Sequence, residues 1–176
     1  MTRKSAKILN PSNLSKSDVY EIARMFAEKF KLSSGEDLRQ IVQKMNGTIE
    51  VGASFEDNDA SGTLFINKNG SFSISIPDHT SIERDRFTIA HEIGHYILHY
   101  IFNEEYKNEE CYTANRSGSS RIEWEANWFA SELLMPEKEF RAAYDDLNKN
   151  LYEISKKFGT SELACSVRAK SLGLDE

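Results

Sequence analysis

The stretch RFTIAHEIGHYILH, residues 86–99, contains three of the four histidines of the chain. Its apolar spacing predicts a long helix over residues 81–102, and this helix carries an H-E-x-x-H motif formed by His91, Glu92 and His95. Positions four apart lie on one helical face, about 6 Å apart along the axis, so both imidazoles can reach one metal ion. Because an unpaired imidazole or carboxylate in an apolar helix would be costly, the pattern indicates a metal site.

The residue types of this motif suit a metal-dependent hydrolase. Zn²⁺ bound by three protein ligands keeps a fourth position for water, lowers the pKa of that water towards about 7 and polarises a carbonyl group. His91 and His95 are therefore candidate metal ligands, and Glu92 is the candidate general base. Two histidines and a carboxylate also suit Mn²⁺ or Fe²⁺, so we expect Zn²⁺, with these two ions as alternatives.

The third ligand must come from another part of the chain. His99 repeats the four-residue step, but it would lie about 12 Å from His91 along a straight helix, so one ion cannot bind all three histidines. We expect His99 to support a ligand, to face substrate or to pack. The next predicted helix offers Glu123 and Glu125, which point about 200° apart, so only one of them can face the metal. Asn127 shares a face with Glu123 and can hydrogen-bond to a ligand histidine, which favours Glu123.

The rest of the chain predicts an α+β fold, with a small three-stranded antiparallel sheet packed on a mostly helical domain. Apolar spacing predicts a helix at residues 15–31, and Ser34 is placed to cap the next one. Alternating residues at 48–77 predict three short strands, the last two joined at Asn69-Gly70. We expect a single domain over residues 1–176, with N-terminal helices at 15–46, the sheet at 47–79, the metal-site helices at 80–136 and C-terminal helices at 137–176.

Composition excludes several classes of protein. Hydrophobic residues at 39% and charged residues at 28% are ordinary for a globular protein, so a disordered chain or a fibre is not expected. Without an apolar run of about 18 residues or a secretory signal, we expect a cytoplasmic protein that does not enter membranes. The net charge of −6 disfavours a broad contact with nucleic acid. Two cysteines, Cys111 and Cys165, are too few for a Cys-ligated zinc site and are expected to be reduced.

Two separated segments, residues 86–99 and EWEANWFASELLMP at 123–136, together resemble the ImmA/IrrE metallopeptidase family. The order of elements over residues 15–173 resembles it more loosely. The resemblance implies a gluzincin-type site, with zinc held by His91, His95 and Glu123 and with Glu92 as general base. It also implies a protein substrate, a helix-turn-helix transcriptional repressor, cleaved to control a mobile element or a stress response.

Two other functions are compatible with the sequence. A non-catalytic, metal-containing module could sequester a repressor or a toxin, and loss of the Glu92 carboxylate would then leave the regulatory effect intact. Residues 151–176 resemble a helix-turn-helix pair, but their four basic and four acidic residues balance, which favours packing or repressor docking over DNA binding. In a peptidase, the substrate would add as a strand to a sheet edge within residues 61–76.

Overall fold

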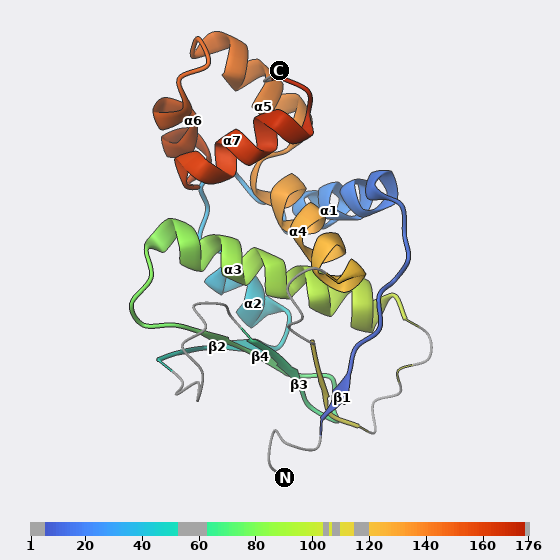
Figure 1. Cartoon of the computed structure of the whole chain (residues 1–176). Helices are drawn as coiled ribbons and strands as arrows, with labels where there is room; N and C mark the ends of the chain where they lie inside the picture. Colours follow the sequence, from blue (N-terminus) through green and yellow to red (C-terminus); the bar gives the residue numbers. More distant parts are fainter. Residues whose placement is uncertain (1–5, 53–62, 104–105, 107–109, 115–119, 175–176) are drawn as a thin grey trace.

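The computed structural model describes residues 6–52, 63–103, 106, 110–114 and 120–174. Over these ranges the chain forms five strands, seven α-helices and one π-helical segment, which confirms the α+β class (Figure 1). None of the helices in the described part is long and apolar enough to cross a membrane. In chain order the elements are β1 (Lys7–Ile8), α1 (Lys16–Phe30), α2 (Arg39–Lys44), β2 (Gly47–Val51), β3 (Thr63–Ile66), β4 (Phe72–Ile76), α3 (Ile82–Gly94), η2 (His95–Ile101), β5 (Tyr112–Thr113), α4 (Arg121–Leu134), α5 (Glu137–Asp146), α6 (Leu151–Phe158) and α7 (Glu162–Ser171).

The sheet has the strand order β1-β5-β3-β4-β2 in the described residues, so the predicted three-stranded antiparallel sheet is wrong. The three predicted strands are present as β2, β3 and β4, and β3 pairs antiparallel with β4 as expected. However, β2 pairs with β4 in parallel, because β3 reverses the chain between them and then lies on the far side of β4. β5 pairs antiparallel with β3, and β1 pairs parallel with β5. Both added strands have only two residues, too few to show a period of two in the sequence.

This strand order changes the expectation for a peptide substrate. β3 and β4 lie inside the sheet, between β5 and β2, and the edges of the described sheet are β1 and β2. β4 is paired on both sides, whereas β5 pairs only with Phe65 and Ile66 of β3. The substrate edge within residues 61–76 is therefore not on β4 and stays a prediction for β3, and residues 61–62 lie outside the described chain.

The helix that carries the histidines packs between the sheet and the other helices (Figure 1). Every residue of β4 is buried, and Ile89 and Ile93 of α3 belong to the same apolar core. α4 packs along α3, and α1 packs against α4. After Gly94 the α-helix continues directly into the π-helical segment η2, where the amide of Phe102 donates to the carbonyl of Ile97, five residues earlier, at 3.0 Å.

Helix starts differ in part from the prediction. Ser81 caps α3, since its side chain accepts a hydrogen bond from the amide of Arg84. The predicted cap at Ser34 is wrong, because α2 begins only at Arg39 and its N-cap residue, Leu38, makes no side-chain cap bond. The Ser34 hydroxyl donates instead to the Glu139 carboxylate at 3.0 Å.

The last three helices, α5 to α7, form a cluster at the end of α4, away from the sheet (Figure 1). A buried arginine of α7, Arg168, pairs with Glu132 of α4 and donates to the hydroxyl of Tyr20 in α1 at 2.7 Å. Arg86 of α3 donates to the carbonyl oxygens of Phe158 and Gly159 between α6 and α7. These buried bonds set the position of the C-terminal cluster relative to α3 and α4.

Candidate metal centre

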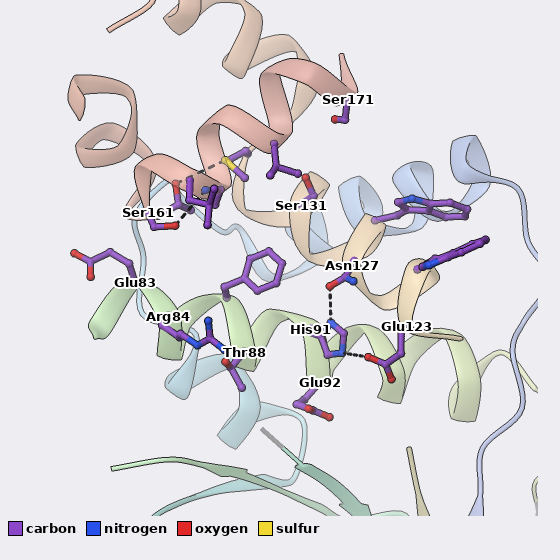
Figure 2. A pocket seen from close by; sticks show the side chains of 18 of the residues that line it. Glu83, Arg84, Thr88, His91, Glu92, Glu123, Asn127, Ser131, Ser161 and Ser171 are labelled. Carbon is purple, nitrogen blue, oxygen red and sulfur yellow. Dashed lines mark hydrogen bonds and ion pairs between the residues drawn. The ribbon is translucent and has the colours of Figure 1, made fainter. Parts of the chain in front are cut away.

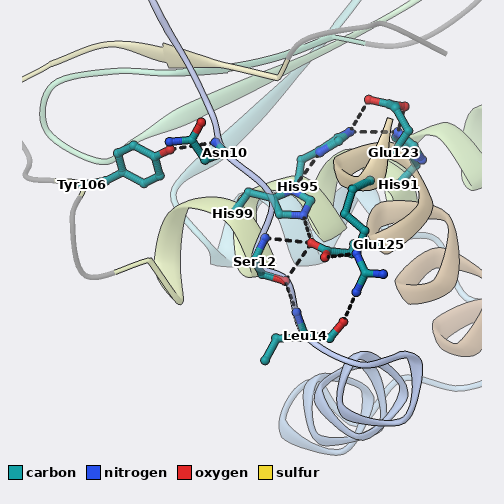
Figure 3. A network of polar contacts seen from close by, with 10 residues as sticks. Asn10, Ser12, Leu14, His91, His95, His99, Tyr106, Glu123 and Glu125 are labelled. Carbon is teal, nitrogen blue, oxygen red and sulfur yellow. Dashed lines mark hydrogen bonds and ion pairs between the residues drawn. The ribbon is translucent and has the colours of Figure 1, made fainter. Parts of the chain in front are cut away.

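Three side chains from two neighbouring helices meet at one point (Figure 3). His91 lies in the last turn of α3, His95 directly follows it at the start of η2, and Glu123 lies in the first turn of α4. The Nε2 atoms of the two histidines are 3.0 Å apart. The two carboxylate oxygens of Glu123 lie 3.2 Å from His91 Nε2 and 3.3 Å from His95 Nε2. Figure 2 shows Glu123 directed at His91 across the gap between the helices.

This arrangement fits a tetrahedral metal ion. Ligand atoms about 2.0 to 2.2 Å from a tetrahedral zinc ion lie about 3.3 Å from one another. The separations of 3.0, 3.2 and 3.3 Å are close to that spacing. Among the described residues, the buried Oε1 of Glu123 has no hydrogen-bond partner, and it lies 3.3 Å from His95 Nε2. The His-His-Glu group can therefore hold a divalent metal.

Close approach of α3 and α4 makes this meeting possible. Gly94 lies directly against α4, where a β-carbon would come within 3.2 Å of the Phe129 side chain and 3.3 Å of the Ala126 backbone. A residue without a side chain at this position lets the two backbones come near enough for Glu123 to reach both histidines.

Asn127 orients the first histidine. Its amide oxygen lies 3.0 Å from His91 Nδ1, the contact expected from the sequence between Asn127 and a ligand histidine. An amide oxygen only accepts hydrogen bonds, so Nδ1 of His91 carries the proton. The lone pair of His91 is consequently on Nε2, the atom that faces Glu123.

The second histidine is held by a buried chain of polar groups. His95 Nδ1 lies 3.0 Å from His99 Nδ1, and His99 Nε2 lies 3.0 Å from an oxygen of Glu125. His99 thus lies off the metal, as the helix geometry requires, and supports a candidate ligand. Glu125 contacts His99 instead, so the structure brings Glu123, and not Glu125, to the imidazoles of His91 and His95.

Burial and mutual contact shift the pKa values of the three candidate ligands. Burial lowers the pKa of His95 to about 3, although Glu123 opposes the shift. For His91 burial is outweighed by the hydrogen bond to Glu123 and the charge of Glu92, so its pKa rises. Burial alone would raise the pKa of Glu123, but the two histidines beside its carboxylate hold the pKa far below its usual value. The ionised Glu123 and the unprotonated His95 are thus in the forms that bind a metal, whereas a metal ion has to compete with a proton for His91.

The site opens into a large cavity with a volume of about 930 Å³ (Figure 2). Glu92 is 4% exposed and lines this cavity together with the three candidate ligands. From there the cavity extends between α3 and α4 to α7. Three exposed apolar side chains line it as well, namely Trp124 of α4 and Leu163 and Val167 of α7.

Two residues of the site were missed by sequence reasoning. Arg121 donates from Nε to Glu125 at 2.7 Å, a pair four residues apart on one helix that the sequence could have indicated. Ser12 donates to the same carboxylate from its backbone amide and its hydroxyl, at 2.8 and 2.7 Å. No sequence signal marks Ser12, because its partner lies 113 positions away.

Comparison with known proteins assigns the chain to a family. The family model of the IrrE N-terminal-like domain matches residues 42–170, so the chain belongs to this family of metallopeptidases. One similar solved structure is described as a Mycobacterium tuberculosis transcriptional regulator, with a TM-score of 0.64 and 14% sequence identity. The match covers 90% of this chain and 48% of that one, so this chain spans about half of its length and shares its fold. No curated protein matches the sequence.

Proposed function

We propose that this metallopeptidase is a zinc-dependent endopeptidase, with the ion held by His91, His95 and Glu123. The observation that carries the proposal is the near-tetrahedral spacing of the three ligand atoms beside Glu92 in a large cavity. When bound there, zinc would supply an acidic water and polarise the carbonyl of the scissile bond. The protein itself orients the two imidazoles and keeps most of the site away from solvent.

Glu92 is the proposed general base. It follows His91 directly in α3, is almost fully buried and borders the same cavity. A carboxylate in that position can accept a proton from the attacking water and pass it to the leaving amine. We expect this transfer to contribute about 10² to 10⁴ in rate.

The proposed substrate is a DNA-binding repressor of the helix-turn-helix class, in keeping with the family resemblance. The apolar side chains of α7 beside the site suit a protein segment better than a small polar molecule. The net charge of −6 also suits a partner that is basic because it binds DNA. Direct DNA binding by α6 and α7 is disfavoured, since Arg168, one of four basic residues there, is only 1% exposed and paired with Glu132.

The test is cleavage of a small helix-turn-helix repressor encoded beside this protein, measured by mass spectrometry after incubation with the zinc-loaded chain. Glu92→Gln should bind zinc as the wild type does and lose cleavage by at least about 100-fold. His95→Ala should lose both. Glu153→Gln, an exposed residue of α6, is the control and should cleave normally.

Each alternative has its own outcome in this experiment. Cleavage by Glu92→Gln at the wild-type rate would contradict the role of Glu92. Tight binding of the repressor by the wild type without any cut would support the non-catalytic sequestering module instead.

A further inference from the structure

We propose that His99 and Glu125 form a positioning relay that holds the ligand His95 in its metal-binding tautomer, and that the relay ends on the N-terminal segment at Ser12. This inference rests on the proposed metal centre. The four groups are joined by consecutive contacts from His95 to His99, Glu125 and Ser12 (Figure 3).

The Glu125 carboxylate sets the tautomers of the relay, because the groups that contact it are hydrogen-bond donors. Glu125 is fully buried, and its Oε1 accepts from Arg121 at 2.7 Å. Its Oε2 accepts from the amide and the hydroxyl of Ser12 and lies 3.0 Å from His99 Nε2. A carboxylate that accepts a hydrogen bond from an imidazole nitrogen places the proton on that nitrogen. His99 therefore carries its proton on Nε2.

The next two tautomers follow from the first. With its proton on Nε2, neutral His99 can only accept at Nδ1. His95 Nδ1, 3.0 Å away, must then be the donor. The lone pair of His95 is left on Nε2, which faces His91 and Glu123. Asn127 has the same effect on His91, so each candidate ligand has its own orienting group.

The π-helical segment provides the geometry for the contact between the two histidines. Bonding between residues five apart widens the helix, so that position i+4 lies slightly less than one turn beyond position i. His95 and His99 have this spacing in η2, and their rings are 5.0 Å apart between centroids. The widened turn thus places the two Nδ1 atoms 3.0 Å apart.

The outer end of the relay lies in the segment between β1 and α1. Besides Ser12, this segment is joined to the site by Arg121, which also donates to the carbonyl of Leu14. The segment is held in place by two further bonds, from the Leu9 amide to the Thr113 carbonyl at 3.0 Å and from the Asn10 amide to the Tyr106 hydroxyl at 2.7 Å. Orientation of His95 thus depends on a part of the chain far from the metal motif in sequence.

The test measures Co²⁺ and Zn²⁺ affinity and the visible spectrum of the Co²⁺-loaded full chain. Glu125→Gln should bind both ions about 10- to 100-fold more weakly and should change the Co²⁺ spectrum, since the orienting acceptor is altered. Ser12→Ala removes one of four bonds to Glu125 and should shift both readouts less, in the same direction. The matched control is Glu132→Gln, because Glu132 is also a buried, arginine-paired glutamate of α4 but does not contact the histidines. It should unfold at a lower temperature and keep wild-type affinity and spectrum.

Wild-type affinity and spectrum in Glu125→Gln would overturn the relay, as would an equal loss in Glu132→Gln. If Glu125→Gln does not fold, Ser12→Ala decides, and an unchanged spectrum in that variant overturns the relay. Failure of the wild type to bind either ion would overturn the metal centre and the relay together. A wild type that binds zinc but cleaves no repressor would contradict the proposed function while leaving the relay in place.

Discussion

At the scale of single residues, Glu125 shows how a buried charge is maintained. Desolvation would raise its pKa, but hydrogen bonds from His99, Arg121 and Ser12 outweigh burial and lower the pKa to about 2. Removing the carboxylate from such a buried network lowers the free energy of unfolding strongly, because the remaining buried donors are left without an acceptor. This residue is therefore sensitive both to substitution and to acid.

We predict that the stabilising effect of the Glu125 charge disappears in acid. Because the pKa is lower in the folded state than its ordinary value of 4.5, the contribution is complete above pH 4.5 and is lost as the pH falls from 4.5 to about 2. The gap in free energy of unfolding between wild type and Glu125→Gln should narrow over that window. Urea unfolding of the two metal-free proteins at several pH values measures this difference in free energy of unfolding. A difference that stays constant from pH 4.5 to about 2 would contradict the prediction.

At the scale of elements, the contact between α3 and α4 decides whether the ligands meet. We predict that Gly94→Val weakens metal binding and lowers the free energy of unfolding by about 1–3 kcal/mol. The added side chain would press on Phe129 and the Ala126 backbone and move the Glu123-bearing helix away. Thermal unfolding and zinc titration would check this. Gly94→Ala, with one methyl group, should show the same effects at smaller size, whereas wild-type zinc affinity in Gly94→Val would be inconsistent with the idea.

The helices of the fold were more predictable than its strands. The apolar period of α1 and of the helix that contains α3 and η2 extends over several turns, so the predicted ranges 15–31 and 81–102 lie close to the observed bounds. The pairing of β2 with β4 could not be read from the sequence, since strands that are adjacent in the chain need not be adjacent in the sheet. The change to π-helical bonding in η2 was also not visible, because its residues fit an ordinary apolar helix.

In the site too, contacts within one helix could be predicted from the sequence, and contacts made by the tertiary fold could not. His91, Glu92 and His95 are neighbours in the chain, and helix geometry alone predicted that they meet. The choice of Glu123 over Glu125 followed from the position of Asn127; in the structure Glu123 lies beside His91 and His95, and its role as a ligand stays a prediction. The donors around Glu125 could not be predicted, because one of them, Ser12, reaches the site only through the tertiary fold.

At the scale of the whole molecule, the C-terminal cluster forms one wall of the cavity. α7 is held to α4 and α1 by the buried contacts of Arg168. Its exposed side chains Leu163 and Val167 line the cavity together with the candidate ligands. If a protein substrate reaches the metal, it passes this apolar surface.

We predict that Leu163→Lys raises the KM for the protein substrate by about 10-fold, since a fully packed apolar contact at an interface is worth about 1–2 kcal/mol. Metal affinity and thermal stability should not change, because Leu163 is 75% exposed. Met25→Lys is the matched control, an exposed apolar residue of α1 that does not line the described cavity. Steady-state cleavage assays would compare the three proteins, and equal KM values would argue against α7 as a substrate contact.

The bond between Ser12 and Glu125 has a consequence for how the protein is made. The two residues are 113 positions apart, and contacts of such long sequence separation close a large loop at an entropic cost. During synthesis the segment that contains Ser12 leaves the ribosome well before its partner helix exists. The contact that supports the candidate ligand His95 can therefore form only after α4 has been translated, so this part of the site is completed well after the segment that contains Ser12.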